Sequence, residues 1–380
     1  MCIICSFYCK FVSVNRSLMK KLILFLSAMA LSAIVSAQQT RYYNAAELNV
    51  IGKPIPTTKD FTRIDTSAYK FNDKTIEEYA CHSTGLAVLF ATDSPFIKAK
   101  WQTSPKNASE NMTAIAQKGL DLYIKQDGEW VFAGVGRPKM EKGPDYDQHS
   151  GTIVKSMAPG RKECLMYLPL YDRLDSLFIG IEEGSYIEPI ENPFKYRIVV
   201  KGSSVTHGLA ASRPGMTYGA RFGRDNGFYT FNLGFSGLSK LQVEYAEYLA
   251  DIEADAFIFD TFSNPSAELI HENFDRFVDI IRASHPETPL IFMQTERRES
   301  RNFDTWREDF ETRKQAAAEQ EIRERMKTDK HIYFLPSDDF LGHDHIATSD
   351  GSHPTDLGFT RMLDSIEPKI LKILKKYGIK

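Results

Sequence analysis

The spacing of apolar residues changes character near residue 195. Before this point the apolar residues form short, alternating runs that are separated by turn residues, as expected of antiparallel strands. Residues 120–125 and 130–134 flank the turn sequence Gln-Asp-Gly-Glu and predict a β-hairpin. Many short strands with turns between them predict an antiparallel β-sandwich of the jelly-roll-like kind. Its other predicted strands are residues 85–93, 96–101, 164–171 and 177–181.

After Pro193 the pattern becomes an alternation of apolar strands and longer helical segments. Strands that alternate with helices indicate βαβ units and a parallel sheet, so we expect an α/β domain in this half. The predicted strands are residues 196–200, 228–233, 256–259, 290–293 and 332–335, and the predicted helices are residues 239–250, 266–284, 304–327 and 355–376.

The N-terminal segment has the features of a secretory signal peptide. Met19-Lys20-Lys21 forms a positive start, residues 22–34 form an apolar core, and Val35-Ser36-Ala37 is a small-residue cleavage site. Residues 1–18 are then an upstream extension, and an N-terminal membrane anchor is the alternative. We expect cleavage after Ala37, a secreted or periplasmic protein, and no stable membrane insertion afterwards.

Three segments follow from these patterns. Residues 1–37 are the upstream extension and signal peptide, residues 38–195 the β-sandwich domain, and residues 196–380 the α/β domain. The formal net charge of the chain is −3, which argues against a nucleic-acid partner. Residues 1–37 carry four basic residues and no acidic one, so their removal leaves a net charge of −7.

Two cysteines, Cys81 and Cys164, remain after the predicted cleavage. In an exported protein they could form a disulfide, and two buried free thiols are an equally good interpretation. The spacing of Cys and His residues does not indicate a structural zinc site.

A serine lies at the end of the first strand of the α/β domain. Ser204 follows this strand closely, and Gly202 and Gly208 permit tight backbone conformations on either side of it. Open α/β sheets bind their ligands at the carboxyl ends of the strands, which is where Ser204 would lie. The alternative is a polar turn in which the serine has no special role.

The next two strands are also followed by candidate groups. Gly237 comes after the second strand and would offer a backbone N–H with no side chain in the way of an acyl group. Asn264 comes after the third strand and would offer a side-chain amide. Taken singly, Gly237 is explained by an ordinary turn and Asn264 by helix capping.

Asp350 and His353 lie three residues apart in a turn near the C-terminus, followed by Pro354 and a helical pattern. A catalytic imidazole needs a carboxylate to fix its tautomer and to stabilise its protonated form. One short segment can therefore supply both groups, although such a pair also occurs by chance.

The ordered set Ser204, Gly237, Asn264 and Asp350-x-x-His353 resembles the SGNH (GDSL-type) hydrolase family, named after its Ser, Gly, Asn and His. The resemblance implies a flavodoxin-like fold, with Ser204, His353 and Asp350 as catalytic triad. It also implies an oxyanion hole built from Ser204, Gly237 and Asn264, and no cofactor or metal.

The chain departs from the pattern of this family at two places. Ser203 stands where the family usually has Asp, and it could still accept or donate a local hydrogen bond. The third sequence block also lacks the usual Gly-x-Asn-Asp form, so only Asn264 is carried over there.

A second resemblance concerns residues 118–123, Lys-Gly-Leu-Asp-Leu-Tyr. They are similar to the Gly-x-Asp-Leu-Tyr signature of a β-sandwich domain that precedes some SGNH esterases. We interpret Asp121 as a solvent-facing strand residue without a catalytic role. The two resemblances together cover about residues 40–376.

Other polar residues have a structural and a functional interpretation. His343-Asp344-His345 has the spacing of a metal site, but a third ligand is not apparent, so a polar loop is favoured. His207 could line the cleft, and a loop position is favoured. Arg213 could bind a polar substrate, or be a surface residue before a helix that starts at Pro214.

From these patterns and resemblances we expect an exported esterase that hydrolyses small acyl esters, acetyl in particular, on a carbohydrate. One alternative is a lipid or thioester hydrolase similar to platelet-activating-factor acetylhydrolases or lysophospholipases, which would be expected to carry an apolar lid. Another is a glycan-binding protein without catalytic activity. The sequence does not fix the glycan or the oligomeric state.

Overall fold

The computed structural model describes residues 39–105, 107, 109–140, 147–337 and 340–380. The predicted signal peptide lies outside the described residues, so it stays a prediction. Residues 42–181 and 185–380 form one compact unit, within which the fold is described below. In the described part of the chain, no helix combines the length and the apolar character that a membrane span requires.

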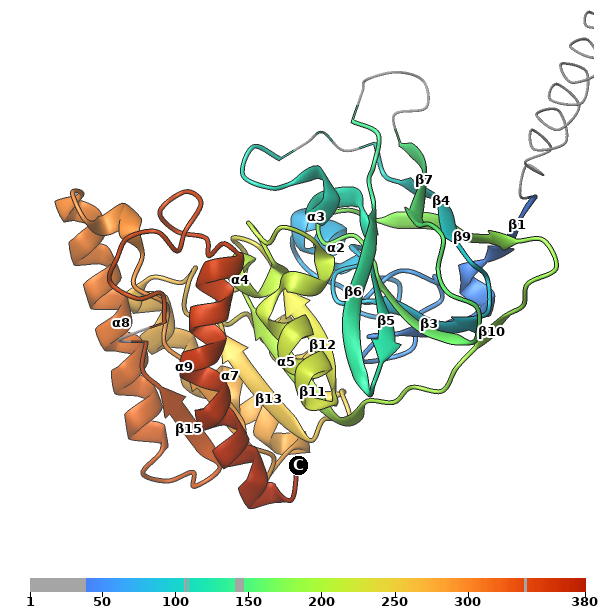
Figure 1. Ribbon diagram of the computed structural model, residues 1–380. Coiled ribbons are helices and arrows are strands. Elements are labelled where there is room, and N and C mark those ends of the chain that lie inside the picture. Colours follow the sequence, from blue (N-terminus) through green and yellow to red (C-terminus); the bar gives the residue numbers. More distant parts are fainter. Residues whose placement is uncertain (1–38, 106, 108, 141–146, 338–339) are drawn as a thin grey trace, which may run out of the picture. The chain divides into compact units, whose positions relative to one another are not determined.

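The first half of the unit is an antiparallel β-sandwich (Figure 1). Its core lies between two sheets and includes Phe90, Leu122 and Ile179, all fully buried. One sheet contains β1 (Thr40–Asn44), β9 (Leu174–Glu182), β4 (Ile97–Thr103) and β7 (Gln148–Val154). The other has the order β10 (Ile187–Pro189), β3 (Ala87–Thr92), β8 (Lys162–Tyr167), β5 (Leu120–Gln126), β6 (Glu129–Gly136), with β2 (Asn49–Ile51) paired to β3.

The second half is a parallel sheet with the order β12-β11-β13-β14-β15. In chain order this is 2-1-3-4-5, the flavodoxin-like arrangement of a doubly wound α/β fold. The strands are β11 (Lys195–Gly202), β12 (Phe228–Gly234), β13 (Ala256–Asp260), β14 (Leu290–Met293) and β15 (Ile332–Leu335).

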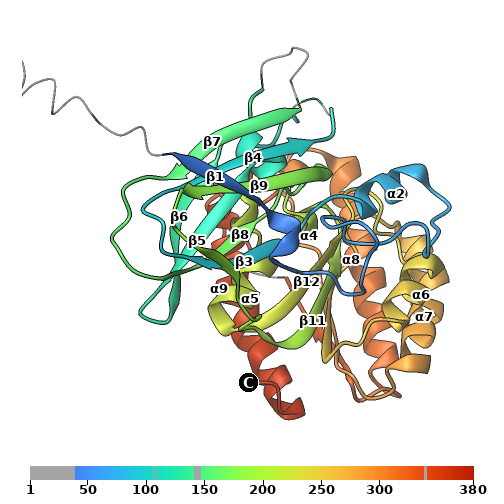
Figure 2. The same cartoon turned by 90° about the vertical axis from the view of Figure 1, so that its right-hand side faces the viewer.

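Helices cover both faces of this sheet, because successive strand residues point to opposite faces. Val199 packs in a core with residues of α6, α7 and α8. Ile198 and Val200 pack in a second core with residues of α5 and α9. Figures 1 and 2 show the two groups of helices on either side of β11. Their bounds are α5 (Tyr218–Asn226), α6 (Val243–Ala250), α7 (Ala267–Ser284), α8 (Thr305–Arg325) and α9 (Asp356–Leu374).

Shorter helical segments complete the described elements. They are η1 (Ala45–Glu47), α2 (Lys74–Ala80), α3 (Ala114–Lys118), α4 (Ser204–His207), η2 (Pro214–Met216), η3 (Glu299–Arg301) and η4 (Lys375–Tyr377). Every predicted strand and helix is present, with ends shifted by a few residues. The predicted fold class, a flavodoxin-like domain after an antiparallel sandwich, is confirmed.

Helix α5 was not predicted, because it contains glycines that weaken an isolated helix. Tertiary packing explains them. A Cβ atom on Gly223 would lie 2.5 Å from Thr230 Oγ1, so only glycine lets α5 approach β12 this closely. Here close packing outweighs local helix propensity.

Cys81 and Cys164 are both free thiols, so the disulfide alternative is wrong. Cys164 is fully buried, and this burial raises the pKa of its thiol to about 12. Cys81 is only half-buried. Among the described residues, Cys164 is therefore a buried thiol and Cys81 a partly accessible one, in place of a cross-link.

Candidate active site

Ser204 is the first residue of α4, directly after the carboxyl end of β11, and is 6% exposed. Two glycines permit this placement. A Cβ atom on Gly202 would lie 2.0 Å from Thr206 Oγ1, and one on Gly234 would lie 2.1 Å from His207 N. Gly208 ends α4 at a φ of +100°. The backbone around Ser204 is thus packed so closely at Gly202 and Gly234 that a residue with a side chain would not fit at either position.

Buried hydrogen bonds join α4 to the neighbouring strand β13 and to Tyr218. Thr206 Oγ1 donates to Asp260 Oδ2 at 2.9 Å and also lies 2.8 Å from the hydroxyl of Tyr218. Asp260 ends β13 and is almost fully buried. Burial and the charge of Glu296 raise the pKa of Asp260 well above its usual range. Ser204 is therefore carried by a helix turn that hydrogen-bonds to the neighbouring strand.

The structure brings Ser204, His353 and Asp350 together. Ser204 Oγ lies 2.9 Å from His353 Nε2, and His353 Nδ1 lies 2.7 Å from Asp350 Oδ2. An ionised carboxylate can only accept, so Nδ1 carries the proton and Nε2 accepts from the serine hydroxyl. This is the hydrogen-bond order that a serine nucleophile and its general base require.

The turn that holds Asp350 and His353 is closed on itself. Asp350 Oδ1 accepts the backbone N–H groups of Ser352 at 3.0 Å and His353 at 2.9 Å. Ser349 N donates to the carbonyl of His353 at 3.0 Å, and Gly351 has a φ of +81°. A local turn therefore presents the imidazole and its carboxylate as one unit.

The pKa of Asp350 is lowered to about 2. Partial burial alone would raise it, but hydrogen bonds from Asn111, from the His353 side chain and from the His353 backbone outweigh burial. Hydrogen bonds to the charged form of a carboxyl favour ionisation. Asp350 is therefore an anion at any pH near neutrality.

Asn264 and Gly237, the other predicted oxyanion donors, lie in turns after β13 and β12. Asn264 Oδ1 accepts the backbone N–H of Ser239 at 3.2 Å, which leaves the NH₂ group for another acceptor. Helix α7 is capped by Ser266, so the capping interpretation of Asn264 is wrong. Gly237 is exposed with a φ of +74°, and a Cβ there would point into open space. Their catalytic roles stay predictions.

Four expectations about neighbouring residues need correction. Ser203 Oγ is fully buried and has no hydrogen-bond partner among the described residues, so the expected local hydrogen bond is not formed. His207 does not lie in a loop or line the cleft. It ends α4, is fully buried and stacks on Tyr171 with ring centroids 3.8 Å apart.

The other two corrections concern the expected positions of Asp121 and Arg213. Asp121 is fully buried, not solvent-facing, and its Oδ2 accepts the Gly215 N–H at 2.8 Å. Arg213 Nη1 lies 3.6 Å from the same oxygen, and the Arg213 side chain is only 20% exposed. Arg213 is therefore an internal contact between the two halves of the unit. The short helix η2 does begin at Pro214, as expected.

The His343-Asp344-His345 segment is occupied by ion pairs. Asp344 makes a bidentate pair with Arg361 at 2.5 and 2.7 Å, and His345 Nδ1 lies 2.7 Å from Glu299 Oε2. Among the described residues, no group of three His, Cys, Asp or Glu side chains is arranged to hold a metal ion. The pairs favour the interpretation of this segment as a polar loop.

Sequence reasoning missed two contacts of the triad. Asn111, which precedes α3, donates from Nδ2 to Asp350 Oδ2 at 3.0 Å. Tyr171, which follows β8, donates its hydroxyl to the Ser204 carbonyl at 3.4 Å. Neither residue belongs to a motif, and each is distant in sequence from its partner. Their positions relative to the triad depend on the docking of the sandwich.

A carboxylic ester hydrolase is the class that this fold and site define. The model of the GDSL-like lipase/acylhydrolase family matches residues 195–371. The N-terminal GxDLY model of SGNH-hydrolase-type esterases matches residues 40–187. The chain belongs to the GDSL-like (SGNH) hydrolase family, with a GxDLY N-terminal region.

Solved structures agree with this assignment. A GDSL-like lipase from Bacteroides ovatus ATCC 8483 is 46% identical, with a TM-score of 0.85 over 89% of this chain and 98% of that chain. The salicylyl-acyltransferase SsfX3 from a tetracycline biosynthetic pathway shares the fold at 20% identity, with a TM-score of 0.66 over 88% and 97%.

A family two carbohydrate esterase from Cellvibrio japonicus also shares the fold, at 14% identity. Its TM-score is 0.57 over 89% of this chain and 98% of that chain. The search of curated protein sequences found no match.

Proposed function

We propose that this protein is an exported serine esterase that removes small acyl groups, acetyl in particular, from a carbohydrate. The observation that carries the proposal is the hydrogen-bonded order Ser204 Oγ, His353 Nε2, His353 Nδ1, Asp350 Oδ2, with distances of 2.9 and 2.7 Å. This order supports catalysis and speaks against the alternative of a glycan-binding protein without activity.

The reaction follows from this geometry. Ser204 Oγ attacks the ester carbonyl while His353 Nε2 takes the hydroxyl proton, and Asp350 stabilises the imidazolium that forms. His353 then gives the proton to the departing alcohol, which leaves an acyl group on Ser204. Water then attacks the acyl-serine while His353 takes one of its protons. When the bond between the acyl carbon and Ser204 Oγ breaks, His353 returns this proton to Ser204 Oγ and the acid is released. In each tetrahedral intermediate the oxyanion is held by the Ser204 and Gly237 N–H groups and the Asn264 amide.

The acid–base pair of the site is polar and partly exposed, which supports a small acyl group on a large polar alcohol. The side chains of His353 and Asp350 are 20% and 30% exposed, so the acid–base pair lies near the surface. Ser300 Oγ and Ser352 Oγ lie 3.1 Å apart next to this turn. The carbohydrate esterase of Cellvibrio japonicus, with the same fold, is the precedent for a glycan substrate.

One observation favours the lipid or thioester hydrolase as a second candidate. Phe303 is fully exposed and Trp306 is 67% exposed at the start of α8. Ser300, three residues before Phe303, donates its N–H to the Gly351 carbonyl at 2.8 Å, which ties this segment to the turn that holds Asp350 and His353. Exposed aromatic residues on a segment that contacts this turn would suit a longer acyl chain.

A panel of esters tests the proposal and separates the two candidates. We expect the purified protein to hydrolyse p-nitrophenyl acetate faster than longer-chain esters and to release acetate from acetylated xylan. Ser204→Ala should lose this activity, whereas Ser203→Ala is the matched control at the adjacent buried serine. Full activity of Ser204→Ala would refute the nucleophile assignment. Activity that rises with chain length would favour the lipid or thioester hydrolase.

Export has its own experiment. The full-length chain would be expressed in a Gram-negative host, and the periplasmic and culture fractions would be analysed by N-terminal sequencing. We expect a chain that begins at Gln38 in these fractions. Recovery of an uncleaved chain in the membrane fraction would instead support the N-terminal anchor.

A further inference from the structure

We propose that Asn111 is a positioning residue of the active site, supplied by the β-sandwich half to orient the carboxylate of Asp350. This inference rests on the proposed function, in which Asp350 orients His353. Asn111 Nδ2 donates to Asp350 Oδ2 at 3.0 Å, and the same oxygen lies 2.7 Å from His353 Nδ1. Asn111 therefore acts on the one carboxylate oxygen that the imidazole uses.

The orientation of the Asn111 amide is determined by its two partners. A carboxylate can only accept hydrogen bonds, so the NH₂ group of Asn111 must face Asp350. The amide oxygen of Asn111 lies 3.0 Å from Ser109 Oγ, which can donate to it. Both ends of the amide thus have a complementary partner, and Ser109 holds the NH₂ group toward the carboxylate.

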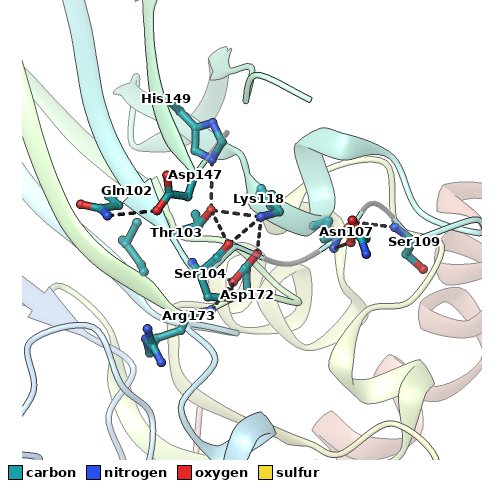
Figure 3. Close-up of polar contacts among 12 residues, drawn as sticks. Gln102, Thr103, Ser104, Asn107, Ser109, Lys118, Asp147, His149, Asp172 and Arg173 are labelled. Carbon is teal, nitrogen blue, oxygen red and sulfur yellow. Dashed lines mark hydrogen bonds and ion pairs between the residues drawn. The ribbon is translucent and has the colours of Figure 1, made fainter. Parts of the chain in front are cut away.

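The segment between β4 and α3 that carries Asn111 is anchored at its start by buried charges. Figure 3 shows Lys118 and Asp172 pointing toward each other, with Ser104 beside both. Lys118 Nζ lies 2.9 Å from Asp172 Oδ2 and donates to the Ser104 carbonyl at 2.8 Å. The N–H of Ser104 donates to Asp172 Oδ1 at 3.1 Å. Lys118 and Asp172 are fully buried, so this anchor is shielded from water.

A second anchor lies closer to Asn111. Gln117, on α3 and 1% exposed, donates from Nε2 to the Asn107 carbonyl at 2.8 Å. Gln117 Oε1 accepts the backbone N–H of Ser109, also at 2.8 Å. One buried side chain therefore holds the backbone at both Asn107 and Ser109, and Ser109 in turn contacts Asn111. Figure 3 shows Asn107 and Ser109 next to each other at this point.

A third contact fixes the segment on the side of the nucleophile. Thr113 Oγ1 donates to the Ser212 carbonyl at 2.6 Å, and Ser212 N donates to Asp356 Oδ1 at 2.9 Å. Asp356 is the first residue of α9, which follows the turn of Asp350 and His353. The segment is thus tied to both sides of the triad, which is the arrangement that a positioning role requires.

The hydrogen bond has a defined chemical effect. Asp350 Oδ1 accepts the backbone N–H groups of Ser352 and His353, and the hydrogen bond from Asn111 restrains the other oxygen, Oδ2. It also favours the ionised carboxylate, in agreement with the lowered pKa of Asp350. Because Asn111 would act through Asp350, its removal should affect the chemical step more than substrate binding.

Kinetics of the full-length protein on p-nitrophenyl acetate test the inference. For Asn111→Ala we expect kcat to fall roughly 3- to 10-fold with KM unchanged, as for one partly exposed hydrogen bond to a charged group. For Asn111→Asp we expect a larger loss of kcat and a shift of the acidic limb of the kcat/KM profile to higher pH. A second carboxylate beside Asp350 adds negative charge that stabilises a proton bound at the site. The site then loses this proton only at a higher pH, which moves the acidic limb.

The control is Asn72→Ala, because Asn72 donates in the same way to a carboxylate, that of Glu244, on an exposed surface. It should keep wild-type kinetics. Wild-type kcat and an unmoved pH profile in both Asn111 variants would overturn the inference. A loss of kcat with a lowered Tm and an unmoved pH profile would also overturn it, since that indicates a structural role only.

Failure of the inference can be told apart from failure of the proposed function. If Ser204→Ala is inactive while both Asn111 variants behave like the wild type, only the role of Asn111 is refuted. If Ser204→Ala remains active, the proposed function itself fails, whatever the Asn111 variants show.

Discussion

The carboxylate of Asp121, on strand β5 of the sandwich, accepts a hydrogen bond of 2.8 Å from the backbone N–H of Gly215, which follows the nucleophile segment. A Cβ atom on Gly215 would lie 2.8 Å from the same carboxylate, so the two segments are in close contact. Burial raises the pKa of Asp121 to about 6, although Arg213 and the Gly215 N–H counteract this rise. This contact between the two halves therefore titrates within an accessible pH range.

Asp121→Asn should change how stability depends on pH. The folded-state pKa of Asp121, about 6, lies above the value near 4 that an unfolded chain has, so the folded protein binds this proton more tightly. The stabilisation from this proton is present below about pH 4 and is lost as the pH rises through about 6. Asparagine stays neutral throughout. Between pH 4 and 7 the free energy of unfolding of the variant should therefore rise relative to that of the wild type, by up to ~3 kcal/mol, and its Tm should rise relative to the wild-type Tm. Thermal unfolding at several pH values measures this, and parallel Tm curves would contradict it.

Asn264→Ala should lower kcat by about 10²–10³ with little change in KM, because an oxyanion donor acts mainly in the transition state. Asn264→Asp is the matched variant, since it keeps the shape and the acceptor for the Ser239 N–H but lacks the donor. Steady-state kinetics on p-nitrophenyl acetate would check both. An active Asn264→Asp would show that the amide does not hold the oxyanion.

Ser203→Ala should leave kcat within about twofold of the wild type and change the free energy of unfolding by no more than ~1 kcal/mol. The Ser203 hydroxyl is buried without a hydrogen-bond partner in the described residues, so its removal breaks no hydrogen bond there. Urea unfolding and ester kinetics would measure the two quantities. A large loss of activity would reveal a role for this hydroxyl that the described contacts do not contain.

Lys118→Met should lower the free energy of unfolding by about 3–5 kcal/mol, because it leaves the buried carboxylate of Asp172 without its cation. The double variant Lys118→Met/Asp172→Asn removes both charges and should recover more than half of this loss. Urea unfolding of the wild type, both single variants and the double variant gives the coupling energy. Simple additivity of the two single effects would contradict the buried ion pair.

The sequence by itself determined the order and type of the main elements. Apolar spacing depends on which face of a strand or helix is covered, and this pattern is local, so six strands of the sandwich and the five strands and four long helices of the α/β half were predicted. The parallel sheet then placed Ser204, Gly237 and Asn264 at the ends of three strands, because the carboxyl ends of parallel strands meet at one edge. Asp350 and His353 followed from one short turn.

Only the tertiary structure decided the contacts between the halves. Strand β5 buries Leu120 and Leu122 in the sandwich core, and alternation then suggests that Asp121 faces solvent. The opposite face of the strand is covered by the α/β half, which buries Asp121 against Gly215. Asn111 reaches Asp350 across 239 residues for the same reason. A residue's local pattern shows which face it is on, but only the docked chain shows what covers that face.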